Sequence, residues 1–487
     1  MNFPVLSTIT FLPIVGAFII LLFIRRDAAV RVAALLFTLA AFVLSLWVYI
    51  SFNQADPNLQ FVERARWVPD LDVQYFLGVD GLNLPLLVLN TLLGVVAVLV
   101  SWGISLRVRE YFFWLLMLSA AVSGVFTALD LIHFFLFWEL ELLPMFLLIN
   151  IWGSGRREYS AMKFVIYTLV GSAFMLAGFL ILYFTVEPHT FDIMRLANST
   201  LRPTIVPLSI IFWFIFIAYA IKLPMFPFHT WLPDAHTDAP TAVSVILAGV
   251  LLKMGGYAMI RINVAIFPNI MRDFALVLAV LATIGVVYGA IVTMAQVDLK
   301  KLIAYSSVSH MGYVLLGITA LTPLGLAGAT MQMVAHGLIT GLLFAMVGLT
   351  YEHSHTRHIP SLGGLSARMP ITGTVFSIAG LASLGLPTMC GFIAEFLVFV
   401  GSFPVWGPLA VISIFGIVLT AGYILWMIQR VFHGPLKPEF DHVVDASPLE
   451  RVPMFILVVF IMLLGLAPSL VTNNISLGLR YIVAKLV

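Results

Sequence analysis

The sequence has little charge and almost no cysteine. Asp, Glu, Lys and Arg make up 10% of the 487 residues and leave a net charge of +2, whereas soluble domains carry about 25% charged residues. The single cysteine, Cys390, excludes an intramolecular disulfide and an iron–sulfur cluster held by cysteines of this chain. These scarcities argue against a soluble globular enzyme, a disordered protein and a nucleic-acid binder.

Hydrophobic residues dominate instead, at 61% of the chain, and the mean hydropathy is +1.07. Long apolar runs in a bilayer must satisfy their own backbone hydrogen bonds, so they form helices. We therefore expect an all-α membrane protein with about 14 transmembrane helices. The predicted spans are 2–24, 29–51, 81–104, 111–129, 131–152, 163–186, 205–226, 240–262, 274–295, 302–320, 325–350, 370–400, 407–430 and 452–476.

The distribution of basic residues predicts the orientation of these spans. Arg25 and Arg26 follow the first apolar run, and no positively charged segment precedes it, so we do not expect a cleavable signal peptide. Arg and Lys are more frequent in the odd-numbered loops than in the even-numbered ones. The bias predicts odd-numbered loops in the cytoplasm and both termini on the outer side.

Charges inside spans are costly and usually serve a function. Glu139 and Glu141 lie in the fifth predicted span, two residues apart and roughly 200° around a helix. One acid is expected to face a polar cavity and the other a partner helix, although both could be purely structural. Lys253 lies near the middle of the eighth span, too deep to reach the interface easily.

Two spans carry a Leu-Pro break beside an ionisable residue. Pro224 follows Lys222 in the seventh span, and because proline has no N–H it weakens the helix there. Pro387 interrupts the twelfth span two turns before Glu395. Paired broken helices are the best sequence pointer to a transport site. They suggest two inverted five-helix repeats, at 105–262 and 263–433. Residues 1–104 would form the three helices before the repeats, and residues 434–487 the last helix after them.

Histidines complete the candidate polar set. His310 and His336 lie inside the tenth and eleventh spans, where they could relay protons because imidazole titrates near neutrality. Satisfied core histidines and a haem site are the alternatives. His229 and His236 lie in a polar link at 227–239 and are candidates for guarding proton access from the cytoplasm. The His353, His355 and His358 group indicates a solvated loop rather than a metal site.

Several continuous motifs resemble the antiporter-like membrane subunits of respiratory complex I. These motifs are Val79–Asn83, Trp138–Glu139, Lys222–His236, Ile246–Tyr257, Lys300–Gly312 and Gly391–Phe396. Fourteen spans, no long C-terminal extension, and glutamate at 395 where related subunits usually carry lysine favour the subunit M (chain 4) branch. The resemblance implies proton translocation through Glu139, Lys222, Lys253, His310, His336 and Glu395. It also implies that Glu139 pairs with Lys222, and it assigns no general role to Glu141.

The same resemblance implies the surroundings of the chain. It would be a non-redox subunit of a proton-translocating NADH:quinone oxidoreductase in an energy-coupling membrane, expected to be a prokaryotic plasma membrane. It would contact other membrane and peripheral subunits, including neighbouring antiporter-like ones. No nucleotide, flavin or metal motif occurs in the sequence, so iron–sulfur clusters, flavin and quinone are expected in partner subunits.

Three alternatives remain at this point. A subunit of a multisubunit sodium/proton antiporter shares the motifs, although Glu395 argues against it. A membrane subunit of a hydrogenase- or ferredoxin-linked relative of complex I also fits. The third alternative is a purely structural spacer, in which the intramembrane charges have no function. The energetic cost of such charges argues against this alternative.

Overall fold

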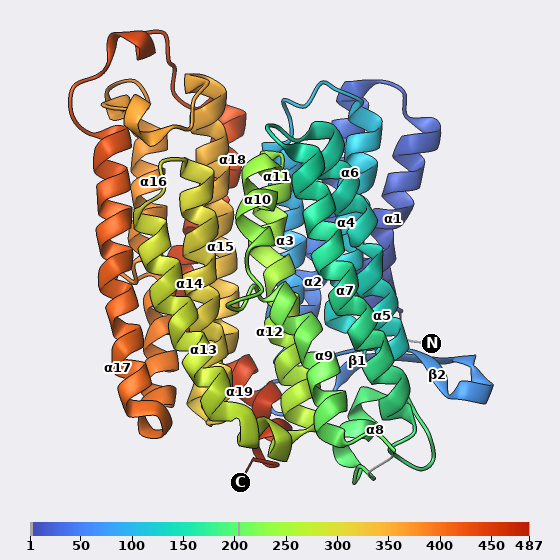
Figure 1. Ribbon diagram of the computed structural model, residues 1–487. Coiled ribbons are helices and arrows are strands. Elements are labelled where there is room, and N and C mark those ends of the chain that lie inside the picture. The colour runs from blue at the N-terminus through green and yellow to red at the C-terminus, as the bar shows by residue number, and fades with distance from the viewer. Residues whose placement is uncertain (1–2, 203–204, 487) are drawn as a thin grey trace.

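The computed structural model describes residues 3–202 and 205–486, which form a helical bundle with one small β-hairpin (Figure 1). In this part of the chain, eleven helical segments are long and apolar enough to cross a membrane, and three apolar helices are shorter. The chain is therefore a multi-pass, mostly helical membrane protein. Both chain ends lie at the end of the bundle that carries the hairpin (Figure 1).

The first part of the chain contains eight helices and the hairpin. The helices are α1 Val5–Phe23, α2 Asp27–Ser51, α3 Leu84–Val100, α4 Val108–Thr127, α5 Leu131–Leu140, α6 Leu142–Trp152, α7 Arg157–Tyr183 and the short α8 Ile193–Asn198. Strands β1 (Gln60–Val68) and β2 (Val73–Val79) pair antiparallel, with Ala65 opposite Tyr75. The hairpin fills most of the stretch between α2 and α3.

The hairpin has a physical role at the start of the bundle. The Glu63 carboxylate accepts hydrogen bonds from the backbone N–H groups of Leu6 at 2.7 Å and Ser7 at 3.1 Å. These donors lie in the first turn of α1, where helical N–H groups have no partner within the helix. The hairpin thus supplies the cap that α1 lacks in its own sequence.

The seventh and eighth predicted spans are irregular around their lysines. Helix α9 (Leu208–Lys222) ends two residues before Pro224, and α10 (Trp231–Asp238) follows it. The second half of the predicted polar link is therefore helical. The next continuous helical segment consists of α11 (Thr241–Ile246), a π-helix at Leu247–Leu251, α12 (Leu252–Ala258) and a π-helix at Met259–Val264. Wide turns thus lie on both sides of Lys253.

The second part contains α13 Pro268–Met294, α14 Leu299–Thr319, α15 Pro323–Ser354, α16 Pro370–Ser383, α17 Cys390–Phe432, α18 Pro448–Leu466 and α19 Ser469–Val483. Helix α17 reverses direction near Trp406, whose backbone leaves the helical range. Gly401, before this point, lies against Gly325 at the start of α15, and Phe432 lies against Gly373 at the start of α16. The predicted span 452–476 is also divided, between α18 and α19.

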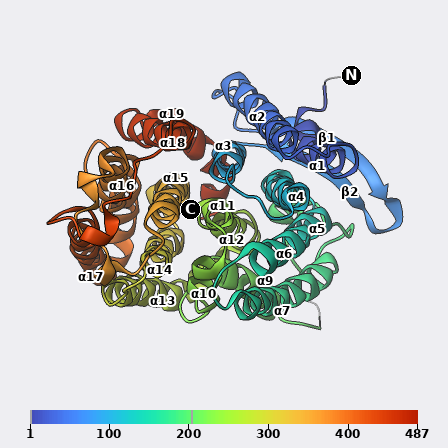
Figure 2. The same ribbon diagram turned by 90° about the horizontal axis from the view of Figure 1, so that it is seen from above.

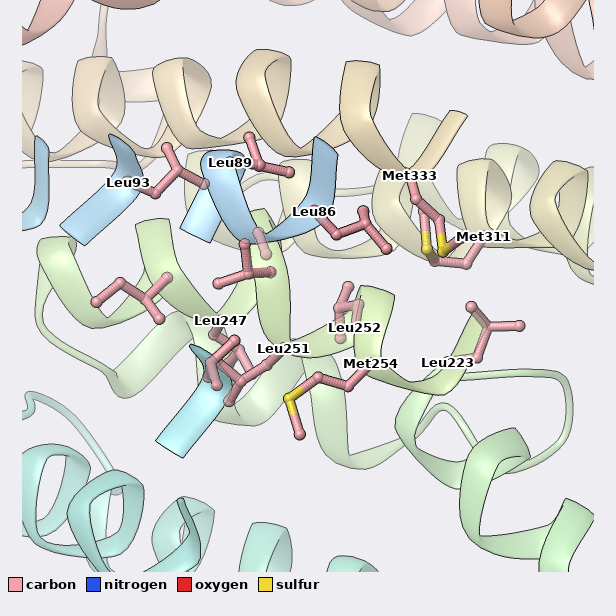
Figure 3. Close-up of a cluster of buried hydrophobic side chains, with 14 of the residues drawn as sticks. Leu86, Leu89, Leu93, Leu223, Leu247, Leu251, Leu252, Met254, Met311 and Met333 are labelled. Atoms are coloured by element: carbon pink, nitrogen blue, oxygen red, sulfur yellow. The ribbon is translucent and has the colours of Figure 1, made fainter. Parts of the chain in front are cut away.

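Seen along the bundle axis, α12 and α15 lie inside, while α17 and the α1–α2 pair lie at opposite edges (Figure 2). The interior is filled by leucine and methionine side chains from α3, α12, α14 and α15 (Figure 3). Gly256 permits close packing here, because a Cβ at that position would lie 2.6 Å from the Met333 sulfur. This apolar packing lies beside the buried polar groups described next.

Candidate functional site

Lys222 forms a buried ion pair with Glu141. The Lys222 ammonium donates to Glu141 Oε1, and the two side chains are 1% and 0% exposed. The rings of Trp138 and Phe164 each lie 5.4 Å from Lys222 Nζ, which adds favourable cation–π contacts. The pair lies where α9 ends, so the lysine occupies the break that the sequence predicts beside Pro224.

Glu139 is not the residue that contacts Lys222, so the pairing implied by the family resemblance differs from the structure. Glu139 stays half-buried beside Ser172, within electrostatic range of Lys222. The reason is local geometry: α5 ends at Leu140 and α6 begins at Leu142, and Glu141 at this junction faces α9. The helical spacing correctly predicts that the two acids face different surroundings, but it cannot say which acid faces the lysine.

Lys253 and His336 form the centre of the site. Lys253 is fully buried, and its Nζ lies 2.7 Å from His336 Nδ1 and also donates to the carbonyl oxygen of Ala248. Ala248 belongs to the π-helix that precedes α12. Wide π turns frequently occur at functional positions because they leave backbone groups available. Hydropathy in the sequence locates the lysine but gives no sign of this irregular helix.

His310 and Glu395 lie on the far side of His336. The ring centroids of His310 and His336 are 5.5 Å apart, and His310 Nδ1 lies 3.7 Å from Glu395 Oε1. Ser383 Oγ lies 3.3 Å from His310 Nε2. His310, His336 and Glu395 therefore meet in one buried group that spans α14, α15 and α17.

The break near Pro387 positions Glu395. Pro387 lies in the gap between α16 and α17, and Gly385 in the same gap has φ +77. The Glu395 carboxylate lies directly against Gly385, where a Cβ would collide with it. A left-handed backbone and this close approach together require glycine at that position.

His229 and His236 are buried but do not join this group through any hydrogen bond described here. His236 stacks on Phe344 with ring centroids 4.5 Å apart, and His229 stacks on Phe226 at 5.8 Å. In the described part of the chain, the ring nitrogens of both histidines have no hydrogen-bond partner. Buried polar atoms of this kind are usually satisfied by internal water.

The structure also contains polar residues that the sequence interpretation missed. Arg261, near the end of the eighth predicted span, is fully buried; it pairs with Asp80 at 2.7 Å and donates to the Tyr481 hydroxyl at 2.5 Å. Lys300 is buried in α14, and its ammonium donates to the carbonyl of Ala239. Gln332 lies beside His310. In the sequence, Gln332 lies four residues before His336, which puts both on one helix face. This spacing could have indicated that Gln332 belongs to the same polar group.

Residues 128–420 match the family described as NADH:quinone oxidoreductase/Mrp antiporter, transmembrane. Among curated relatives, chain 4 of an NAD(P)H-quinone oxidoreductase from Gloeobacter violaceus is 41% identical, over 97% of this chain and 91% of the relative. Subunit M of an NADH-quinone oxidoreductase from Rickettsia typhi is 37% identical over the whole of both chains.

Solved structures give the same picture of the fold. A chain of respiratory complex I from Thermus thermophilus superposes with a TM-score of 0.90 at 28% identity, covering 99% of this chain and 100% of that one. A chain of the Mrp complex from Dietzia has a TM-score of 0.89 at 20% identity, covering 99% and 98%. At that lower identity the likeness concerns the fold alone.

Proposed function

The chain belongs to the family of transmembrane subunits shared by NADH:quinone oxidoreductases and Mrp antiporters, and from this membership we propose that it translocates protons in the membrane arm of a complex I. The observation that carries the proposal is the buried series of ionisable groups from Glu141 and Lys222, through Lys253 and His336, to His310 and Glu395. Charges buried inside membrane spans are costly and usually serve a function.

In this proposal the chain crosses the membrane fourteen times. The broken α9–α10 segment and the broken α16–α17 segment occupy corresponding places in two inverted five-helix units, 105–262 and 263–433. Residues 1–104 and 434–487 flank these units. The odd-numbered loops face the cytoplasm and both termini face the outer side, in line with the distribution of Arg and Lys.

The proton pathway would run along the middle of the bundle. A proton arrives from the cytoplasm near the break in α9, with His229 and His236 beside the route, and loads the Lys222 site. Its affinity there depends on the carboxylates of Glu141 and Glu139, because a nearby negative charge stabilises the ammonium. The proton then passes Lys253, His336 and His310 to Glu395, and leaves on the outer side.

The chain itself would carry no redox group. Electrons would pass through flavin, iron–sulfur clusters and quinone in partner subunits, and the energy would reach this subunit by electrostatic or conformational coupling. The chain would thus act as a non-redox subunit of the enzyme, beside neighbouring antiporter-like subunits in an energy-coupling membrane such as a prokaryotic plasma membrane. This assignment follows from the relatives named chain 4 and subunit M.

The second candidate function is sodium/proton exchange in an all-membrane antiporter, which the description of the matched family as NADH:quinone oxidoreductase/Mrp antiporter favours. Extraction in mild detergent, followed by native mass measurement and identification of the co-purifying chains, distinguishes the two. We expect a large assembly with iron–sulfur and quinone-binding subunits. A smaller assembly without redox centres would instead support the antiporter.

A further inference from the structure

A small polar cavity lies between α14, α15 and the α16–α17 break. It has a volume of about 10 Å³ and is lined chiefly by His310, Gln332, His336, Ser383, Gly391 and Glu395. That is about the room that one water molecule needs. Gln332 is the lining residue with an amide side chain. Because an amide does not titrate near neutral pH, its presence among proton-carrying groups needs a separate explanation.

Only the nitrogen of the Gln332 amide has a hydrogen-bond partner among the described residues. Gln332 is 2% exposed, and its Nε2 lies 3.4 Å from His310 Nδ1. In the part of the chain that the structure describes, Gln332 Oε1 and His336 Nε2 are both buried without a hydrogen-bond partner. Both residues line the same cavity. One water there would satisfy both atoms, as buried waters typically do.

The contact also restricts the tautomer of His310. While Nδ1 accepts from the Gln332 N–H, it cannot donate to Glu395 Oε1, which lies 3.7 Å away. The ring proton of neutral His310 is then on Nε2, which lies 3.3 Å from Ser383 Oγ. If His310 carries a proton on Nδ1, that N–H faces the N–H of the Gln332 amide, and two donors cannot form a hydrogen bond. The amide must then turn so that its oxygen accepts from Nδ1–H.

We propose that Gln332 is a positioning residue of the proton pathway, which holds one water between the two histidines and sets the tautomer of His310. The turn of the amide that lets Oε1 accept a hydrogen bond from a protonated His310 Nδ1 also replaces Oε1 by the amide N–H at the water, and thus reverses the water's hydrogen bonding. Gln332 therefore makes the protonation of His310 and the orientation of the water depend on each other. The inference rests on the proposed proton translocation.

Two variants of Gln332 test this role in the assembled enzyme. Gln332→Leu keeps the approximate shape but removes both hydrogen-bonding ends, and Gln332→Glu keeps the shape but removes the N–H end when ionised. Gln296→Leu, two residues beyond the end of α13, is the matched control, since the Gln296 amide donates to the nearby carbonyl of Val292 and lies outside the site. The readouts are proton pumping in vesicles against pH, and infrared difference spectra of isotope-labelled histidine, which report the imidazole tautomer.

We expect Gln332→Leu to slow pumping on the order of tenfold, and both variants to shift the pH profile and the His310 tautomer band. Groups that also affect this profile are Lys253 on α12, His336 on α15, Glu395 on α17 and Tyr313 on α14 itself. An unchanged profile and band in either assembled variant would overturn the inference, so Gln332→Glu decides if Gln332→Leu does not assemble.

Lys253→Leu separates this inference from the proposed function. If Lys253→Leu stops pumping while both Gln332 variants behave as the control, only the role of Gln332 is wrong. If Lys253→Leu pumps normally in the assembled enzyme, the proposed pathway itself fails.

Discussion

Lys253 Nζ lies 2.7 Å from His336 Nδ1 at the centre of the bundle, and both side chains are buried. When Lys253 is charged it has only donors, so His336 Nδ1 is then the acceptor and the ring proton is on Nε2. His336 lines the cavity that also contains His310 and Glu395. The contact therefore links a buried amine to the second half of the site.

The buried Lys222–Glu141 pair gives the first prediction. Glu141→Gln leaves the buried ammonium of Lys222 without its paired carboxylate, and breaking such a pair costs roughly 3–5 kcal/mol. We expect lower amounts of assembled enzyme and slower pumping than in Glu139→Gln, because Glu139 makes a weaker, half-buried contact. Assembly on native gels and proton pumping in vesicles measure both effects.

The control for this prediction is the double variant Glu141→Gln with Lys222→Met. Removing both charges takes away the unpaired ammonium, so assembly should recover while pumping stays low. A Glu139→Gln variant that assembles worse than Glu141→Gln would contradict the structural pairing.

The Arg261–Asp80 pair gives the second prediction. Arg261 is fully buried and also bonds the Tyr481 hydroxyl, so it ties the end of the eighth span to α19. Arg261→Met should lower the free energy of unfolding by about 3–5 kcal/mol. The thermal midpoint of the purified protein should therefore fall. Asp80→Asn combined with Arg261→Met should cost less than the sum of the single changes.

An exposed ion pair supplies the comparison for this test. Arg368 and Asp441 lie 3.1 Å apart with side chains 46% and 66% exposed. Exposed pairs contribute about 0–1 kcal/mol, so Arg368→Met should leave the midpoint almost unchanged. Equal losses from Arg261→Met and Arg368→Met would contradict the buried role of Arg261.

Asp445 gives a prediction about pH. Partial burial raises the pKa of this loop carboxyl, but hydrogen bonds from the Thr372 hydroxyl and from the backbone N–H groups of Ile371, Ala446 and Thr372 outweigh that effect and lower the pKa. A depressed pKa means that the folded state favours the carboxylate. The stabilisation is therefore present above the unfolded pKa, about 3.9, and is lost as the pH falls through the folded pKa.

The matching variant is Asp445→Asn. Its thermal midpoint should lie below that of the unchanged protein at neutral pH, and the difference should shrink as the pH falls below about 4. A difference that stays constant with pH would show that the carboxylate charge does not matter there.

The sequence predicts well those features that depend on one residue inside an apolar run. Lys222, Lys253 and Glu395 are visible in this way because a charge stands out against 61% hydrophobic residues. Pro224 and Pro387 likewise indicate interruptions, since proline removes a backbone donor whatever its neighbours are. The structure accordingly has helix ends near both prolines.

Features that depend on contacts between distant segments could not be predicted. The choice of Glu141 over Glu139 depends on how the α5–α6 junction faces α9. The pairing of Arg261 with Asp80 joins residues far apart in the sequence, so no local pattern indicates it. Gln332 carries no charge, so charges inside apolar runs do not indicate it, and its importance depends on a cavity formed with three other segments.

The most direct test of the account is the rate of proton translocation by the assembled enzyme with Lys253→Leu, reconstituted in vesicles and driven by quinone reduction. Lys301→Leu, at the start of α14, serves as the control for loss of a lysine. We predict that proton translocation falls on the order of a hundredfold, as for loss of an acid–base group, while the control pumps normally. Undiminished pumping by fully assembled Lys253→Leu enzyme would contradict a pathway through the centre of this chain.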